Sequence, residues 1–167
     1  KINNENLKNK NYDYYSKIQE CIKKNKDDTI NREIYLRTMK TMNFKSTNAT
    51  YLLLFLETCV NTDTHIVPLD FTLEHIYAQK KKSELANQSL MDNIGNLTLI
   101  EGKNSENGHK GNSSLGSKSY DKKIASYEGS SCFITSKLPK TYIDFTEDTI
   151  VIRNNEITEL LDKYTEY

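Results

Sequence analysis

The chain has few of the residues from which small proteins build disulfide frameworks or zinc sites. It has no tryptophan among its 167 residues and only three cysteines, Cys21, Cys59 and Cys132. These cysteines are isolated and odd in number, and no Cys-x-x-Cys pair occurs, so neither a disulfide framework nor a cysteine-rich zinc site is expected. We interpret all three as small core hydrophobes of a protein in a reducing cytoplasm.

Long apolar runs and an excess of charge are missing as well. The longest apolar stretch is residues 51–56, far below the ~20 residues that cross a bilayer. No basic and then apolar signal segment opens the chain, so we expect no contact with a membrane. Lys and Arg together number 23, as do Asp and Glu, so the net charge gives no support for nucleic acid, acidic substrates or membranes as partners.

The composition that remains is that of a folded protein with a modest core. Hydrophobic residues make up 36% and aromatic residues 10% of the chain, which argues against disorder of the whole chain. A chain of 167 residues suffices for one ordinary domain. Because the chain begins with Lys1 rather than Met, we expect it to be a piece of a longer protein.

The first third of the sequence is predicted to be a helical scaffold over residues 1–60. Apolar residues recur at helical spacing in residues 12–24 and 31–42, as in amphipathic helices. Ser46 or Thr47 can cap a third helix that runs to Cys59. That helix is too apolar to face solvent, so we expect it to be central to the core.

Two short strands joined by a long loop are predicted next. Residues 71–76 alternate in the manner of a strand, and a turn at residues 93–95 opens a second strand at residues 96–100. A short helix is predicted between them at residues 83–91. Residues 101–117 are rich in Gly, Asn and Ser, a composition typical of functional loops.

The last part of the chain is predicted to be helical again. Short helices are expected at residues 120–127 and 132–138, with Pro139 breaking the second. Thr146 can cap a terminal helix running toward Tyr167, in which residues 157, 160, 161 and 164 form an apolar stripe. The fold class is therefore α+β and predominantly helical.

Four polar residues near the two strands could form a site for phosphodiester hydrolysis. Glu74 and His75 end the first strand, Asn96 begins the second, and Asn104 follows it. Hydrolysis needs a base, a cation and groups that hold the base still. His75 suits the base, since an imidazole titrates near pH ~6.5. Glu74 and Asn104 supply hard oxygen ligands for Mg²⁺ or Mn²⁺.

Asn96 is predicted to hydrogen-bond the backbone of the loop that carries His75. Each residue taken singly has a simpler interpretation. A Glu-His pair is commonly a surface pair, Asn96 after Gly95 is by default a turn residue, and Asn104 can merely cap a helix. Their order and spacing favour the catalytic interpretation.

The order of these residues carries a resemblance to a known family. Leu73-Glu-His-Ile-Tyr-Ala-Gln79, then Ile94-Gly-Asn-Leu-Thr-Leu-Ile100, then Asn104, and then Lys118 with Tyr120 resemble the C-terminal HNH domain (DUF1524) of GmrSD-type restriction endonucleases, in the His-Me finger superfamily. The resemblance covers roughly residues 52–161, including a closing Ile-x-x-Arg segment at residues 150–153. It implies a ββα-metal core embedded among N-terminal and C-terminal helices, over residues 61–167.

The resemblance also implies roles for the matching residues. His75 matches the general base, Asn96 the central asparagine, and Glu74 and Asn104 the metal-binding positions. Gln79 and Lys118 match further polar positions, expected to support the site and contact phosphate. Two departures stand out. Ala78 replaces the family's usual proline, which should loosen the loop after His75, and the C-terminal helix lacks the family's frequent tryptophan.

Lysines around the predicted site could neutralise a DNA backbone. Eight basic and five acidic residues lie between His75 and Lys123. Solvated surface lysines are the plainer interpretation of this excess, but the motif favours phosphate contacts. The lysines assigned to DNA are Lys80, Lys81, Lys82, Lys103, Lys110 and Lys118. His109 in the same region is interpreted as an exposed loop residue, with a phosphate or metal contact as the alternative.

The sequence thus predicts a metal-dependent DNA endonuclease domain of a prokaryotic restriction or anti-phage defence protein. Its expected partners are DNA and an N-terminal sensor or NTPase part that the chain lacks. Two alternatives remain. One is a DNA-binding or partner-binding module with the same fold and a weakened site, and the other is a purely structural helical domain in which the motif is accidental.

Overall fold

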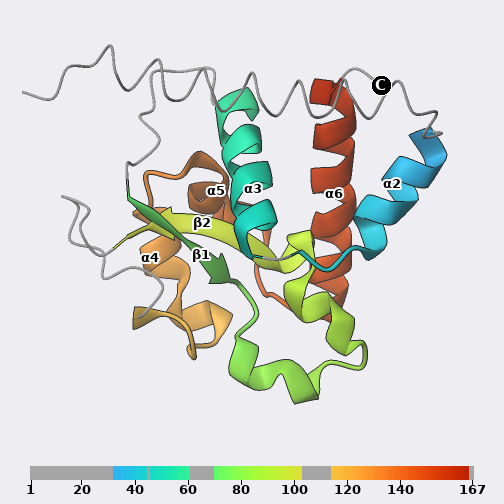
Figure 1. Cartoon of the computed structure of the whole chain (residues 1–167). Helices are drawn as coiled ribbons and strands as arrows, with labels where there is room; N and C mark the ends of the chain where they lie inside the picture. Colours follow the sequence, from blue (N-terminus) through green and yellow to red (C-terminus); the bar gives the residue numbers. More distant parts are fainter. Residues whose placement is uncertain (1–31, 45, 61–69, 103–113, 166–167) are drawn as a thin grey trace, which may run out of the picture.

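The computed structural model describes residues 32–44, 46–60, 70–102 and 114–165, and the helix predicted at residues 12–24 lies outside them. Its helices pack around one small sheet of two strands (Figure 1). The α-helices and strands, in chain order, are α2 (Arg32–Thr41), α3 (Ser46–Val60), β1 (Phe71–His75), β2 (Leu97–Glu101), α4 (Ile124–Glu128), α5 (Phe133–Thr141) and α6 (Glu147–Thr165). The predicted class, α+β and predominantly helical, is confirmed.

The two strands pair antiparallel, and the long connection between them is irregular. Phe71 lies opposite Glu101, and His75 lies opposite Leu97. The prediction of two short strands joined by a long loop is confirmed. The prediction of a single helix at residues 83–91 is wrong. Two 3₁₀ helices, Gln79–Glu84 and Gln88–Asp92, form instead, because Asn87 is extended and its side chain caps the second helix by accepting from the Ser89 N–H.

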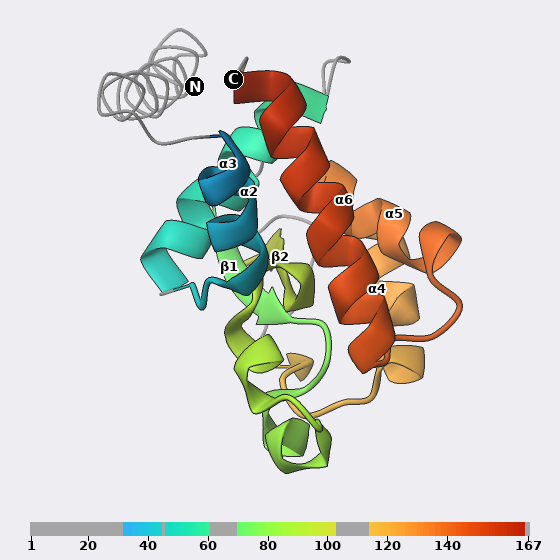
Figure 2. The same cartoon turned by 90° about the vertical axis from the view of Figure 1, so that its right-hand side faces the viewer.

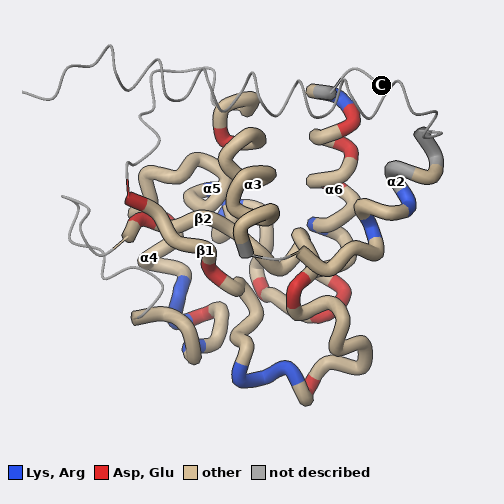
Figure 3. The backbone as a smooth tube through the Cα atoms, viewed as in Figure 1, with Lys and Arg blue, Asp and Glu red and all other residues tan. Residues whose placement is uncertain are grey.

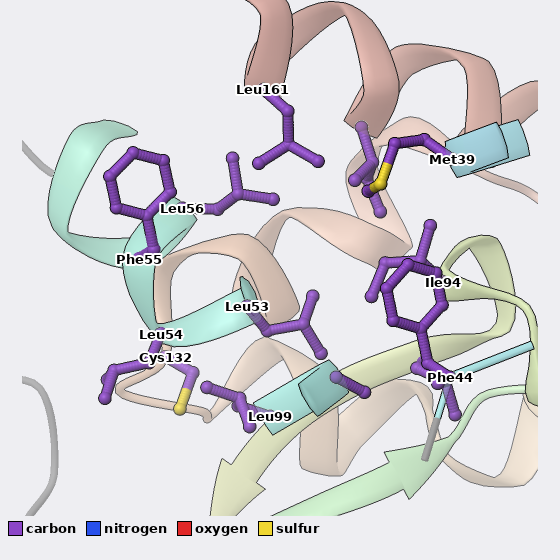
Figure 4. Close-up of a cluster of buried hydrophobic side chains, with 13 residues drawn as sticks. Met39, Phe44, Leu53, Leu54, Phe55, Leu56, Ile94, Leu99, Cys132 and Leu161 are labelled. Atoms are coloured by element: carbon purple, nitrogen blue, oxygen red, sulfur yellow. The ribbon is translucent and has the colours of Figure 1, made fainter. Parts of the chain in front are cut away.

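One core cluster, here called the α3 core, lies between α3, the sheet and α6 (Figure 4). Leu53 and Leu56 of α3 meet Leu99 of β2 and Leu161 of α6 there, and each of the four is at most 1% exposed. Cys132 is buried in this cluster and Cys59 packs against it, as predicted for core hydrophobes. No helix in the described ranges is long and apolar enough to span a membrane.

A second cluster, here called the α4 core, lies on the opposite side of β2. Ile76 and Ile100 meet Tyr127 of α4, Leu138 of α5 and Ile150 of α6 in it. Successive side chains of a strand point to opposite faces, so Leu99 enters the α3 core and Ile100 enters the α4 core. Every residue of β2 is therefore buried, and the strand is held between helices on both faces.

Helix α6 joins the two halves of the molecule. It crosses the front of the view in Figure 2, with α2 and α3 on one side and α4 and α5 on the other. The Thr149 N–H contacts Oγ1 of Thr146 at 3.4 Å, in the predicted capping position. Ile157 and Leu161 of the predicted stripe are buried in the α3 core, which confirms the orientation of the helix.

Pro139 does not end α5 as predicted. The helix continues for two more residues, to Thr141, although proline removes its own N–H from the helical hydrogen bonds and its ring crowds the carbonyl four residues earlier. The Tyr142 N–H donates to the carbonyl of Leu138 at 2.9 Å, which closes the last turn beyond the proline.

Candidate functional site

His75 ends β1 with its imidazole held between two polar side chains. Its Nε2 lies 3.1 Å from Oδ1 of Asp92 and 3.2 Å from the side-chain nitrogen of Gln79. The His75 side chain is 14% exposed and that of Asp92 is 44% exposed. Burial lowers the pKa of His75, although the hydrogen bond that its ring donates to the Asp92 carboxylate opposes this shift. The imidazole is thus a partly shielded group, and its burial favours the neutral form.

The Asn96 side chain holds the backbone that follows His75. Its Oδ1 accepts from the Tyr77 N–H at 2.7 Å, and its Nδ2 donates to the carbonyls of Tyr77 at 3.3 Å and Met91 at 2.9 Å. Asn96 is fully buried, so nearly all its hydrogen-bonding capacity is used on main chain. One amide therefore ties the loop after His75 to the 3₁₀ helix that ends at Asp92.

Ala78 occupies the position where proline was expected. Its backbone has φ −64° and ψ 130°, and a φ near −65° is the value that proline enforces. Ala78 is also almost completely buried. The backbone at Ala78 therefore has a conformation that proline would also adopt, and burial of Ala78 and the Asn96 hydrogen bond to Tyr77 support it.

Glu74 points into the protein, away from the His75 ring. Its Oε1 accepts from Nζ of Lys123 at 2.7 Å and from the hydroxyl of Tyr127 at 3.3 Å. Both members of the ion pair have fully buried side chains. The Lys123 ammonium also donates to the carbonyls of His75 at 2.6 Å and Ile76 at 3.1 Å, so it holds the backbone at the end of β1 in place.

The second oxygen of Glu74 has no hydrogen-bond partner among the described residues. A buried polar atom left without a partner costs about 1–3 kcal/mol, and an ion or water is a common reason for one. A carboxylate oxygen is a hard ligand of the kind that Mg²⁺ and Mn²⁺ take. The donor therefore fits a divalent cation, while Asn104, the other predicted ligand, lies outside the described residues.

Other groups of the described ranges do not add a metal site. In these ranges no three His, Cys, Asp or Glu side chains come together in a way that could hold an ion. Glu74 and His75 are neighbours in sequence, but their side chains leave opposite faces of β1. The structure thus brings Asn96, Gln79 and His75 together around one loop and sets the Glu74 carboxylate behind it.

The predicted DNA-contacting lysines lie partly on the loop beside His75. Lys80 and Lys82 are exposed, whereas Lys81 is half-buried and pairs with Glu84 at 3.3 Å. This segment is the continuous blue stretch at the bottom of Figure 3. Lys118 is exposed at a separate place in the chain. Three further residues, Lys103, Lys110 and His109, lie outside the described ranges.

The backbone behind Asn96 is held by a buried arginine. The Nη1 of Arg153 donates to the carbonyls of Ile94 at 3.1 Å, Gly95 at 2.8 Å and Leu97 at 2.8 Å. Burial lowers the pKa of Arg153 to about 10, so the guanidinium remains charged at neutral pH. The predicted Ile-x-x-Arg segment therefore supports the start of β2 rather than contacting the site directly.

Three residues around the site were missed by the sequence interpretation. Lys123 and Tyr127 are the lysine and tyrosine that reach Glu74. The sequence did contain a signal for the first two. Lys123 stands three residues after Tyr120 and four before Tyr127, the spacing of one helical face, and a lysine on an aromatic face indicates a buried partner rather than solvent. Asp92 carried no such signal, because its contact with His75 spans 17 residues.

The chain was compared with known protein families, with curated proteins and with solved structures. The model for the C-terminal domain of GmrSD restriction endonucleases matches residues 4–160 of the chain. No curated protein and no solved structure gave a match. The matched range includes α2 to α5, both strands and most of α6.

Proposed function

The chain belongs to the C-terminal domain family of GmrSD restriction endonucleases, and we propose that it is a metal-dependent DNA endonuclease of the HNH type with His75 as its general base. Family membership makes it a nuclease domain of restriction systems. The metal dependence, the HNH type and the role of His75 are proposed from the residues at the end of β1 and in the loop that follows it.

The observation that carries the proposal is the fixed, partly exposed imidazole of His75. It stands at the end of a paired strand, between Asp92 and Gln79, while the Asn96 amide immobilises the backbone two residues later. A general base must be held in place and neutral at working pH. Burial lowers the pKa of His75, which favours the neutral, proton-accepting form.

In the proposed reaction, His75 accepts a proton from the attacking water. The water oxygen forms a new bond to phosphorus, and the phosphorus–oxygen bond to the leaving strand breaks. The leaving oxygen takes its proton from solvent, and His75 then releases the proton that it accepted to solvent, which restores the neutral base. Asn96 and Lys123 hold the His75 segment still, by hydrogen bonds to Tyr77 and to the His75 carbonyl, so the base needs no reorganisation.

A divalent cation, Mg²⁺ or Mn²⁺, is proposed to bind at the unpartnered oxygen of Glu74 and the side-chain oxygen of Asn104. When bound, such an ion neutralises charge on the phosphate and on the leaving oxygen. Lys123 keeps the other Glu74 oxygen occupied, so one oxygen of this buried carboxylate is left without a partner among the described residues. The arrangement would supply one protein carboxylate oxygen to the ion and leave further positions to water and phosphate.

Phosphate contacts are proposed for the exposed lysines of the loop after β1, Lys80 and Lys82, with Lys118, Lys103 and Lys110 as further candidates. Lysines neutralise phosphate charge without distinguishing bases, so little sequence selectivity is expected from this domain. Selection of the DNA is proposed to lie in an N-terminal sensor or NTPase part of a longer protein, and a cytoplasmic location follows from a DNA substrate.

Plasmid cleavage by the purified chain and its His75→Ala variant tests the proposal. Each protein is incubated with supercoiled DNA and Mg²⁺, Mn²⁺ or EDTA, and nicked and linear forms are separated on a gel. A Lys140→Ala variant on the exposed surface of α5 is the control. Cutting by the parent and the control alone, and only with metal, is the expected result.

Two outcomes would contradict parts of the proposal. If His75→Ala cuts as fast as the parent, His75 is not the base. If neither protein cuts any DNA while circular dichroism shows both folded, and binding to DNA is unaffected by His75→Ala, the domain is a DNA-binding module. Repeating the assay with the proposed N-terminal part present distinguishes a domain that has no nuclease activity from one that needs this part in order to cut DNA.

A further inference from the structure

We infer that Asp92 is a positioning residue that holds the His75 imidazole in one tautomer, with the proton on Nε2 and the lone pair of Nδ1 directed to the attacking water. The inference deepens the function proposed above and rests on it. Asp92 was not among the predicted site residues. It reaches His75 across 17 positions of sequence.

The tautomer follows from the chemistry of the two partners. A neutral imidazole carries one N–H, and an ionised carboxylate can only accept hydrogen bonds. With Oδ1 of Asp92 at 3.1 Å from Nε2, the contact is favourable when the proton is on Nε2. The other nitrogen, Nδ1, has no hydrogen bond to a described residue, so its lone pair is available as a proton acceptor.

Gln79 offers the competing arrangement. As placed, its amide nitrogen lies 3.2 Å from the same Nε2 and would require an unprotonated Nε2. The oxygen and nitrogen of such an amide exchange places on a half-turn of the side chain, and Gln79 is exposed and free to make it. The Asp92 charge makes its hydrogen bond about twice as strong as a neutral one, so Asp92 decides the tautomer and the Gln79 oxygen turns toward Nε2.

Asp92 is itself held by the N-terminal helical segment. Its carbonyl accepts from the Phe44 N–H at 2.9 Å, and Asn43 and Asn93 form an isolated β-bridge beside it. The side chain of Asn93 donates to the carbonyl of Lys40 at 3.1 Å. Contacts from the end of α2 and from the α2–α3 connection thus set the position of Asp92, and through it the position of the His75 ring.

Nitrogen-15 NMR measures the tautomer without any nuclease activity. Long-range correlations between the ring nitrogens and the Hδ2 and Hε1 protons distinguish a protonated Nε2 from a protonated Nδ1. The chain has three histidines, so replacing His65 and His109 assigns the His75 signals. A protonated Nε2 in the parent, and a loss of this preference in Asp92→Asn, are expected at a pH where imidazole is neutral.

A protonated Nδ1 in the parent, or an unchanged tautomer in Asp92→Asn, would overturn the inference whether or not the protein cuts DNA. Asn is close in shape to Asp, and Asp92 is partly exposed, so the variant is expected to fold. Circular dichroism checks this. Asp92→Glu, which keeps the charge, should retain part of the preference.

Cleavage kinetics supply a second, independent arm. Asp92→Asn should lower kcat by roughly 10- to 100-fold, by analogy with the loss found when a group that orients a metal-binding histidine is removed, with KM for DNA unchanged. Asp148→Asn, at an exposed site in the first turn of α6, is the matched control. An equal kcat in Asp92→Asn and in the control, with the NMR change present, would show that the tautomer does not limit the reaction and would overturn the assigned role. A parent that does not cut DNA contradicts the proposed function, and the NMR arm still decides whether Asp92 sets the tautomer.

Discussion

The ammonium group of Lys123 lies 2.7 Å from the Glu74 carboxylate in a fully buried ion pair. Burial raises the pKa of Glu74 and lowers that of Lys123, and the attraction between the two charges opposes both shifts. Replacing a buried pair by apolar groups can be nearly neutral, but removing one partner leaves a charge without compensation. The pair therefore couples the stability of the protein to the position of the predicted catalytic strand.

Lys123→Met is expected to lower the free energy of unfolding by about 3–5 kcal/mol, because Glu74 would remain buried without its partner. Urea denaturation measures the change. The adjacent Lys122→Met, at an exposed position, should cost less than about 0.5 kcal/mol. The double variant Lys123→Met with Glu74→Gln should recover part of the loss, since the uncompensated charge is gone. Equal costs for the two lysine variants would contradict the energetic role of the ion pair.

Gly95→Ala is expected to destabilise the start of β2. A Cβ at this position would collide with the carbonyl oxygen of Ile150 and lie 2.9 Å from Cβ of Asn154, so α6 would have to move. Overpacking of this kind costs about 1–3 kcal/mol. Gly129→Ala is the control, because Gly129 is exposed and has an ordinary φ of −84°. A thermal shift no larger than that of the control would show that α6 can move at little cost.

Glu57 should make the stability depend on pH. Its carboxylate accepts from the backbone N–H groups of Phe133 and Ile134, each at 2.9 Å, and so caps α5 in place of Cys132, which provides no side-chain cap. Burial, with a smaller contribution from nearby Glu101, raises the pKa of Glu57 from 4.5 to about 7. The folded state therefore binds more protons than the unfolded state between these values.

It follows that the contribution of Glu57 to stability is fully present below pH ~4.5 and is lost as the pH rises through ~7. The change is on the order of 3 kcal/mol at most, because one pKa unit corresponds to about 1.4 kcal/mol. Denaturation of the parent and of Glu57→Gln from pH 5 to 8 measures it as the pH-dependent difference. Glu128→Gln, at an exposed position, should show the slope of the parent. The same slope in Glu57→Gln would contradict the raised pKa.

The loop lysines should affect DNA affinity through charge alone. Lys80→Ala combined with Lys82→Ala removes two exposed positive charges beside His75. If each contacts one phosphate, the slope of log K against log salt should fall by about 2 for duplex DNA. Fluorescence anisotropy at several salt concentrations measures the slope. The matched double variant Lys137→Ala with Lys140→Ala, on exposed positions of α5, should keep the parent's slope, and an equal loss in both would mean non-specific attraction.

Local patterns in the sequence were sufficient for the elements of the fold. The alternation at residues 71–76 predicted β1, and the apolar spacing at residues 157–164 predicted the buried face of α6. The order of Glu74, His75 and Asn96 predicted polar side chains at the end of β1 and at the start of β2. The prediction of one helix at residues 83–91 failed because apolar spacing does not reveal a side-chain cap inside the segment. The side chain of Asn87 caps a second 3₁₀ helix there and so divides the expected helix into two.

The sequence by itself determined the two strands, most of the helices that the structure describes and the motif, because periodicity and capping act over a few neighbouring residues. Only the tertiary structure decided which distant groups surround that motif. Asp92 meets His75 across 17 residues, Lys123 meets Glu74 across 49, and Glu57 caps α5 across 76. Such contacts form because a buried polar or charged atom needs a partner. The packing of distant segments determines which partner lies beside it, and a pattern of neighbouring residues does not contain that information.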